Sequence, residues 1–201
     1  EFVINATFRY VSAGAGMPFP ERERLMDHVM VVDQHVRYAL VLQATLGTML
    51  ALARGFVPGG GAAMALVSVL GVAWLAFVEV VHRCRGRPLG VRLARADRYI
   101  RYLLLALLLI VAVGLVGGGW PLPGWLRWKL ALFAGVVSCG IGIRLKLIGW
   151  FRCWEQLRRA QDPAPLDQAL MAPYWAATRV LLLLWVFIAG IVALSVWGRF
   201  L

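Results

Sequence analysis

Residues 126–150 read LRWKLALFAGVVSCGIGIRLKLIGW, a long apolar run with basic residues near both ends. The run follows a turn rich in tryptophan and proline, residues 120–125, and it ends close to Arg144 and Lys146. Tryptophan is enriched where membrane helices meet water, and arginine and lysine are enriched on the cytoplasmic side. The stretch therefore predicts a transmembrane helix that starts at one interface and ends at the other, basic, interface.

The composition of the whole chain agrees with this prediction. Of its 201 residues 61% are apolar and only 15% are charged, yet the formal net charge is +11. A soluble domain carries about a quarter charged residues, whereas here the charges fall between long apolar runs. Because the basic residues flank these runs, we expect their partner to be the lipid bilayer and not nucleic acid.

The order of apolar runs predicts an all-α, polytopic membrane protein with about five transmembrane helices. The expected spans are residues 38–53, 62–81, 102–116, 126–150 and 178–197. We expect the helix of the fourth span to continue through Arg159, since no breaker interrupts it, and to be broken in residues 161–167, which read QDPAPLD.

The apolar pattern divides the chain into an N-terminal segment, residues 1–36, and a transmembrane bundle, residues 37–201. We expect the segment to be cytoplasmic or interfacial, or to include the end of an upstream helix. Residues 20–36 are expected to form a helix that leads into the first span.

The segment from residue 83 to residue 101 contains seven arginines and a single acid, Asp97. The positive-inside rule places these arginines in the cytoplasm, and binding of anionic lipid headgroups is their alternative role. An inner-membrane protein with a periplasmic C-terminus follows from five spans.

Candidate metal ligands lie near the first span. His28 and His35 are seven residues apart on one helical face, and Met26 and Met30 flank His28. Thioether and imidazole together suit copper(I), so one interpretation is a copper-handling site at the entrance to the membrane bundle. A second is haem b held between His35 and His82, because haem iron accepts axial imidazoles. In a third, the histidines lie at the interface without a ligand.

Two further charged residues are candidates for a role inside the membrane. Glu79, near the end of the second span, is positioned to form a structural ion pair with Arg83 or with an arginine of another helix, or to act in a proton or cation relay. Lys129, at the start of the fourth span, is expected to extend toward the headgroups. The three cysteines have no metal-binding spacing, and no nucleophile with a base or phosphate loop is visible. We therefore favour a protein that is not an enzyme.

Two neighbouring stretches carry a resemblance to a known family. Residues 97–115, DRYIRYLLLALLLIVAVGL, followed by residues 124–146, GWLRWKLALFAGVVSCGIGIRLK, resemble the paired helices of the HemJ/CopD-like membrane proteins. In the HemJ-like pattern, a helix beginning GWLxxK is followed about three turns later by a histidine. Gly124, Trp125, Leu126 and Lys129 match the opening, but Gly140 stands where the histidine is expected.

The resemblance implies one of two activities. HemJ-like proteins are linked to porphyrinogen oxidation with haem, and CopD-like proteins to copper passage across the inner membrane. Gly140 puts HemJ-type chemistry in doubt. The sequence leads us to expect a non-enzymatic, CopD-like membrane protein in copper handling or a membrane subunit of a larger complex. The alternatives are a haem b redox protein and a purely structural accessory subunit that packs against other membrane subunits.

Overall fold

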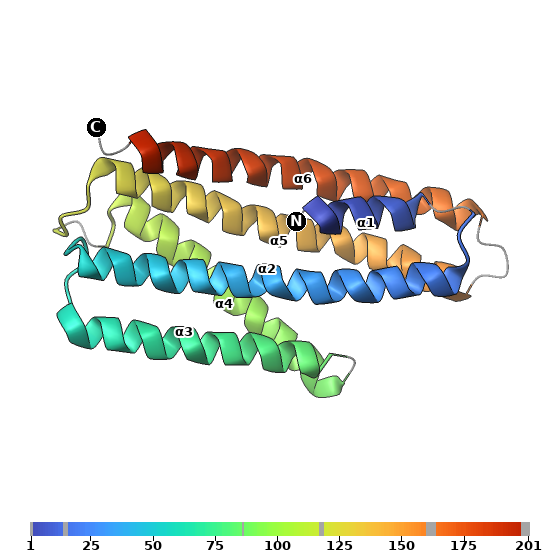
Figure 1. Cartoon of the computed structure of the whole chain (residues 1–201), viewed down its shortest axis with the longest axis horizontal. Coiled ribbons are helices and arrows are strands. Elements are labelled where there is room, and N and C mark those ends of the chain that lie inside the picture. Colours follow the sequence, from blue (N-terminus) through green and yellow to red (C-terminus); the bar gives the residue numbers. More distant parts are fainter. Residues whose placement is uncertain (1, 14–15, 86, 117–118, 160–163, 198–201) are drawn as a thin grey trace. The chain divides into compact units, whose positions relative to one another are not determined.

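The computed structural model describes residues 2–13, 16–85, 87–116, 119–159 and 164–197, and every regular element within these ranges is a helix (Figure 1). The helices are α1 (Phe2–Ser12), α2 (Phe19–Ala53), α3 (Gly60–Arg83), α4 (Pro88–Val113), α5 (Gly124–Arg159) and α6 (Ala164–Trp197).

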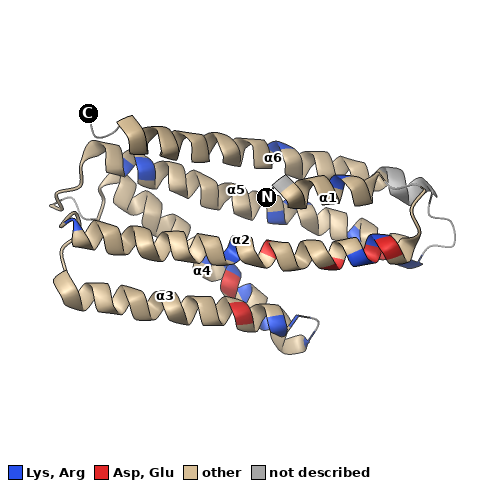
Figure 2. Cartoon of the chain, viewed as in Figure 1, with Lys and Arg blue, Asp and Glu red and all other residues tan. Residues whose placement is uncertain are grey.

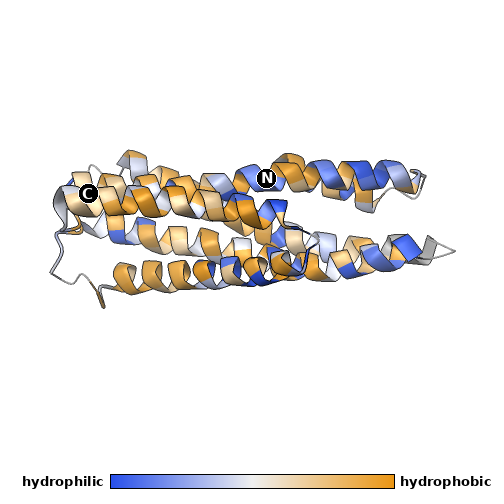
Figure 3. Ribbon diagram, turned by 90° about the horizontal axis from the view of Figure 1, so that it is seen from below, coloured by the Kyte–Doolittle hydropathy of each residue, from blue (hydrophilic) through white to orange (hydrophobic). Residues whose placement is uncertain are grey.

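Four of these helices, α2, α3, α5 and α6, are long and apolar enough to cross a membrane. Hydrophobic residues cover much of the length of the helices in Figure 3, as expected where side chains face lipid rather than water. The chain is thus an all-α, polytopic membrane protein, and the four helices contain the expected first, second, fourth and fifth spans.

The third expected span, residues 102–116, lies largely in α4 but is shorter than the others. The helix ends at Val113, where Gly114 adopts a left-handed conformation (φ 84°) that glycine tolerates best. The apolar part, residues 102–113, is about 18 Å long at a rise of about 1.5 Å per residue, against about 30 Å for the hydrocarbon core. A complete crossing by α4 stays a prediction.

The predicted continuity of two long helices is confirmed. α5 has 36 residues and ends at Arg159, and α2 runs without interruption from Phe19 through the first span. At about 1.5 Å per residue, α5 is about 54 Å long and exceeds the hydrocarbon core. Of the expected break, residues 161–163 lie outside the described residues, whereas residues 164–167 already belong to α6. The C-terminal end at residues 198–201 is also outside the described residues.

The chain divides into two compact units, and α2, α5 and α6 contribute to both. The first unit contains Glu1–Asp33 and Gly135–Ala189, and the second contains Gln34–Ala134 and Gly190–Leu201. The expected N-terminal segment therefore supplies most of its residues to a unit built also from α5 and α6.

In the first unit, α1 is buried along one helical face. Ile4, Phe8, Val11 and Ser12 recur at helical spacing and are all buried. The Trp150 indole, which is itself fully buried, donates a hydrogen bond to the Ser12 hydroxyl at 2.9 Å, and its ring contacts Phe8 edge to face at 4.9 Å. α1 is thus fastened to α5 by apolar packing and by a satisfied buried polar pair.

The start of α2 joins the same core. Phe19 stacks on Trp154 with 5.1 Å between ring centroids, and Trp154 stacks on Trp150 at the same separation. The Arg22 guanidinium lies 5.5 Å from the Trp154 ring, a favourable cation–π arrangement. Thr178 of α6 donates a hydrogen bond of 3.0 Å to Asn5, so α6 also holds α1 in this unit.

In the second unit, the later part of α2 packs closely against α3. A Cβ atom at Gly71 of α3 would collide with the side chain of Thr45 on α2, so glycine permits a close helix approach, as small residues do in membrane bundles. Further along, the Ser68 hydroxyl lies 3.6 Å from the Met49 sulfur. The two helices are antiparallel neighbours joined by a short turn (Figure 1).

Two turns of the second unit lie at the same end. The Phe56 ring, in the α2–α3 turn, contacts the Trp125 ring after the α4–α5 turn at 5.9 Å. The α3–α4 turn, with its arginines, lies at the opposite end of α3. Aromatic and basic turns are therefore separated along the helices of this unit, as the sequence pattern predicts.

Candidate functional site

A group of polar side chains lies between α2 and α3 near the basic end of the second unit. We call it the α2–α3 cluster; its members are Gln34, Tyr38, Glu79, His82 and Arg83. Gln34 and Tyr38 are four residues apart on α2, and Glu79 is three and four residues from the other two on α3. This spacing places each set on one side of its helix.

Glu79 is the centre of the hydrogen bonds in this cluster. The Tyr38 hydroxyl donates to Glu79 Oε2, and Arg83 Nε donates to Glu79 Oε1 at 2.5 Å. The expected ion pair between Glu79 and Arg83 is therefore confirmed. The carboxylate is about one third exposed, whereas the Arg83 side chain is 77% exposed, so the pair lies where α3 emerges from the packed part of the unit.

Three buried polar atoms in the described part of the chain have no hydrogen-bond partner: Gln34 Oε1, Trp74 Nε1 and His82 Nδ1. Gln34 is only 4% exposed, and its Nε2 donates to the Val78 carbonyl at 3.2 Å, so its amide is held between the helices. A buried polar atom without a partner costs on the order of 1–3 kcal/mol. Two of the three atoms, Gln34 Oε1 and His82 Nδ1, belong to the α2–α3 cluster.

His35 approaches the same cluster from α2. Its imidazole is exposed and contacts the Tyr38 ring edge to face at 6.3 Å. Tyr38 is in turn bonded to Glu79, three residues before His82. The structure therefore brings His35 and His82 to the same end of the α2–α3 pair, where His82 is partly buried and His35 is exposed.

The other predicted metal ligands are divided between two faces of α2. Met26 is buried and Met30 is partly buried, whereas His28 is exposed. Because residues four apart share a helical face and residues two apart do not, the two methionines lie together and His28 points away from them. Copper binding by Met26, His28, Met30 and His35 as one set stays a prediction.

Larger metal-binding groups are missing from the part of the chain that the structure describes. No three histidine, cysteine, aspartate or glutamate side chains there gather closely enough to hold a metal ion. The cysteines are free thiols, with Cys139 buried and Cys84 and Cys153 partly exposed. A closed, four-ligand site of the structural zinc type is therefore not found in these residues.

Lys129 lies at the aromatic end of the second unit, away from the arginine-rich turn. Its Nζ is 4.7 Å from the centre of the Trp125 ring. This cation–π contact fits a residue that extends along its own helix toward the interface. Trp125 and Lys129 both belong to the GWLxxK opening on which the resemblance noted in the sequence rests.

Several polar residues in the second unit were not recognised from the sequence. Gln34 and Tyr38 share a helical face with the buried Val41, and this polar interruption of a packed face could have identified them. Asp97 is only 2% exposed and accepts a 3.1 Å hydrogen bond from Arg101. Their spacing of four residues is the available signal for that pair.

Comparisons with known proteins found no relative of this chain. The chain matches no protein-family model, no curated protein and no solved structure.

Proposed function

We propose that this chain is a non-enzymatic, CopD-like protein of the inner membrane that handles copper, and that His82 of the α2–α3 cluster is its principal ligand. In this proposal the arginine-rich α3–α4 turn faces the cytoplasm and the end of α6 faces the periplasm. Copper enters or leaves the protein at the cytoplasmic end of the α2–α3 pair. The protein works with other membrane subunits that deliver or receive the ion.

The observation that supports the proposal most directly is His82 Nδ1, which is buried and has no hydrogen-bond partner. An unprotonated imidazole nitrogen is a good ligand for copper. The unpartnered Gln34 oxygen lies on the facing helix in the same cluster. Ionisable residues inside membrane helices commonly mark paths for ions or protons.

The small number of donors favours transient binding over storage. A storage site surrounds its ion with several strong ligands, and such a group is not found among the described residues. A single imidazole with few other donors holds an ion weakly enough to release it. The proposal therefore concerns passage or transfer of copper and not a structural metal.

Copper(I) titration of the purified full chain in detergent tests the proposal, with a colorimetric chelator as the competitor. We expect binding by the wild-type chain and a loss of affinity of at least about tenfold in His82→Ala, comparable to the effect of disturbing a metal site. Gln43→Ala is the matched control, because Gln43 is an exposed polar residue on α2 in the same unit. Circular dichroism checks that each variant remains helical.

The outcomes separate the assignments. Unchanged copper affinity in a folded His82→Ala protein overturns the role of His82. Loss of binding in His28→Ala or Met30→Ala instead moves the site to the methionine and histidine residues of α2. If the wild-type chain binds no copper, the copper function itself is rejected.

A second candidate function, binding of haem b, is favoured by the placement of His35 and His82 at one end of neighbouring helices. Imidazoles from two helices are a common axial ligand set for haem in membrane bundles. The optical spectrum after haem addition decides this: a Soret band that is lost in both His35→Ala and His82→Ala supports haem. A fully folded, colourless protein rejects it.

A further inference from the structure

We propose that exposed arginines of the α3–α4 turn and of the first half of α4 bind the phosphate headgroups of anionic phospholipids. We call this set the arginine surface; its members are Arg85, Arg87, Arg92, Arg95 and Arg98. All five are exposed. Basic residues gather at this end of α3 and α4 in Figure 2.

Acidic residues are scarce in the segment that carries the arginine surface. Asp97 is the one acidic residue between positions 83 and 101. It is 2% exposed, and both of its oxygens accept hydrogen bonds from Arg101. The exposed face of this segment is therefore strongly positive, and its charge complements that of a phosphate layer.

Apolar and aromatic side chains on the same segment indicate a lipid and not a soluble anion. Leu89, Val91 and Leu103 are more than half exposed, and Tyr99 contacts Tyr102 edge to face at 6.4 Å on the exposed side. Tyrosine prefers the boundary between headgroups and acyl chains. A surface that is both basic and apolar matches that boundary. A soluble polyanion would bind the arginines but would bury none of the apolar side chains.

The length of α4 places the arginine surface at the headgroups. The apolar part of α4, residues 102–113, measures about 18 Å and cannot span a hydrocarbon core of about 30 Å without drawing the preceding turns toward it. Arg95 and Arg98 are in those turns. Long arginine side chains extend from such positions toward phosphate, and the guanidinium group binds phosphate with two parallel hydrogen bonds.

Backbone hydrogen bonds hold the described residues on both sides of the α3–α4 turn. The amide of Arg87 donates to the Cys84 carbonyl at 3.1 Å, and that of Arg85 donates to the His82 carbonyl at 3.2 Å. Pro88 starts α4, and a side chain at Gly90 would collide with the Cys84 carbonyl oxygen. These backbone bonds and the close contact at Gly90 restrain the described residues at the end of α3 and the start of α4.

The test measures lipids retained by the purified full chain. Native mass spectrometry compares phosphatidylglycerol with phosphatidylcholine of the same acyl chains, added to the protein in detergent. We expect the wild-type chain to prefer phosphatidylglycerol and the triple variant Arg92→Gln, Arg95→Gln, Arg98→Gln to lose that preference by roughly tenfold or more. The control triple variant, Arg9→Gln, Arg24→Gln, Arg152→Gln, removes three exposed arginines from the first unit and should keep it.

Additional conditions identify the chemistry. Replacement of the same three arginines by lysine should retain part of the preference, because the charge remains but the two parallel hydrogen bonds do not. A millimolar excess of inorganic phosphate should not displace the lipid, since phosphate makes no apolar contact. Tyr99→Ser should weaken the retention of both lipids, because it removes an aromatic contact, and should leave the preference for phosphatidylglycerol unchanged.

Five results would overturn the proposal, and four of them come from the lipid experiments. These are equal retention of both lipids by the wild-type chain, an unchanged preference in the glutamine triple variant, an equal loss in the control variant, and displacement by inorganic phosphate. Tight binding of single-stranded RNA through the same arginines, without lipid preference, would also overturn it. Thermal unfolding of each variant shows whether the fold is retained, which is expected for exposed positions.

Discussion

The Arg22 guanidinium donates two hydrogen bonds to the carbonyl oxygen of Val11, at 3.1 and 2.8 Å from its Nε and Nη2 atoms. Val11 belongs to the last turn of α1, where carbonyl groups have no partner within the helix. A cation at this end also favours the helix dipole. Arg22 is 3% exposed. A buried charge from the start of α2 therefore satisfies a carbonyl group at the C-terminal end of α1.

We therefore expect Arg22→Met to destabilise the protein. The substitution keeps an apolar side chain but removes two charge-assisted hydrogen bonds to a buried carbonyl, at a cost of about 2 kcal/mol. This corresponds to a fall in Tm of about 4–8 °C for a protein of this size. Thermal unfolding followed by tryptophan fluorescence is the measurement. Arg24→Met, two residues away and exposed, should change Tm little, and an equal fall in both variants would contradict the assignment.

Two glycines in neighbouring helices should respond to alanine in opposite directions. Gly71 faces Thr45 in close contact, whereas a Cβ atom at Gly47 would meet no atom within 4 Å. Gly71→Ala is expected to cost about 1–3 kcal/mol through overpacking. Gly47→Ala is expected to be neutral or to gain up to about 1 kcal/mol from helix propensity. A stabilising Gly71→Ala in thermal unfolding would show that α2 and α3 do not pack at this point.

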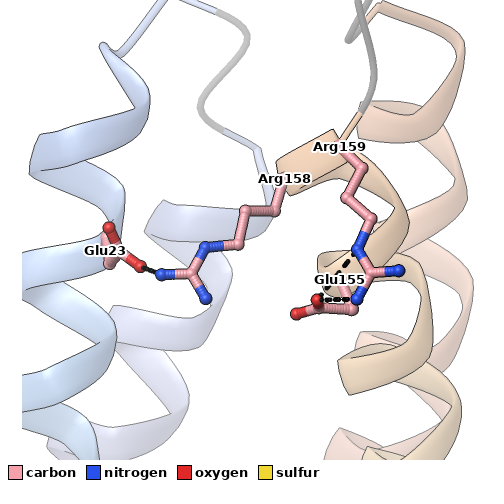
Figure 4. A network of polar contacts seen from close by, with 4 residues as sticks. All are labelled: Glu23, Glu155, Arg158 and Arg159. Carbon is pink, nitrogen blue, oxygen red and sulfur yellow. Dashed lines mark hydrogen bonds and ion pairs between the residues drawn. The ribbon is translucent and has the colours of Figure 1, made fainter.

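The Glu23–Arg158 ion pair connects α2 and α5 in the first unit, and Glu155 pairs with Arg159 one turn apart on α5 (Figure 4). The Arg158 side chain is about half exposed, so water screens the pair. A double-mutant cycle with Glu23→Gln and Arg158→Gln should give a coupling energy below about 1 kcal/mol. A larger coupling would mean that the pair is shielded from water, for example by a partner subunit.

Thiol labelling should distinguish the three cysteines. Cys139 is 4% exposed, whereas Cys84 and Cys153 are partly exposed. We expect a maleimide to modify Cys84 and Cys153 in the native protein and to reach Cys139 only after unfolding, as measured by mass spectrometry of single-cysteine variants.

The same reagent tests orientation in membrane vesicles. Cys84 lies in the arginine-rich α3–α4 turn, which we propose to be cytoplasmic. A membrane-impermeant maleimide should therefore label Cys84 in inside-out vesicles and leave it unlabelled in right-side-out vesicles. Labelling in the opposite vesicles would reverse the proposed topology.

Helices could be predicted from the sequence because their signals are local. The apolar run of residues 126–150, continued without a breaker to Arg159, identifies α5, and the structure confirms its C-terminal end. The expected third span, residues 102–116, differs from α4, which begins at Pro88 and ends at Val113. The charged residues Asp97, Arg98 and Arg101 thus belong to the same helix as the apolar run. Local hydropathy patterns therefore predict that a helix forms, but they do not determine how deeply that helix lies in the membrane.

Contacts between distant segments could not be predicted in this way. The bond between Ser12 and Trp150 joins residues separated by most of the chain, and nothing in either local sequence specifies the other. The α2–α3 cluster was recognised only in part: Glu79 and Arg83 share a helix, so their ion pair follows from spacing. Gln34 and Tyr38 join them from another helix, whose rotation about its axis the sequence pattern does not determine.

The packing of α1 has a consequence for the order in which the protein assembles. α1 is synthesised before α5 and α6, yet its apolar face is covered by Trp150 and its polar face is bonded to Thr178. At roughly 5–20 residues per second, α1 leaves the ribosome roughly 10–30 s before these partners are available. During that interval Ile4, Phe8 and Val11 need temporary cover from lipid or a chaperone. Completion of the first unit therefore waits until α5 and α6 have been synthesised.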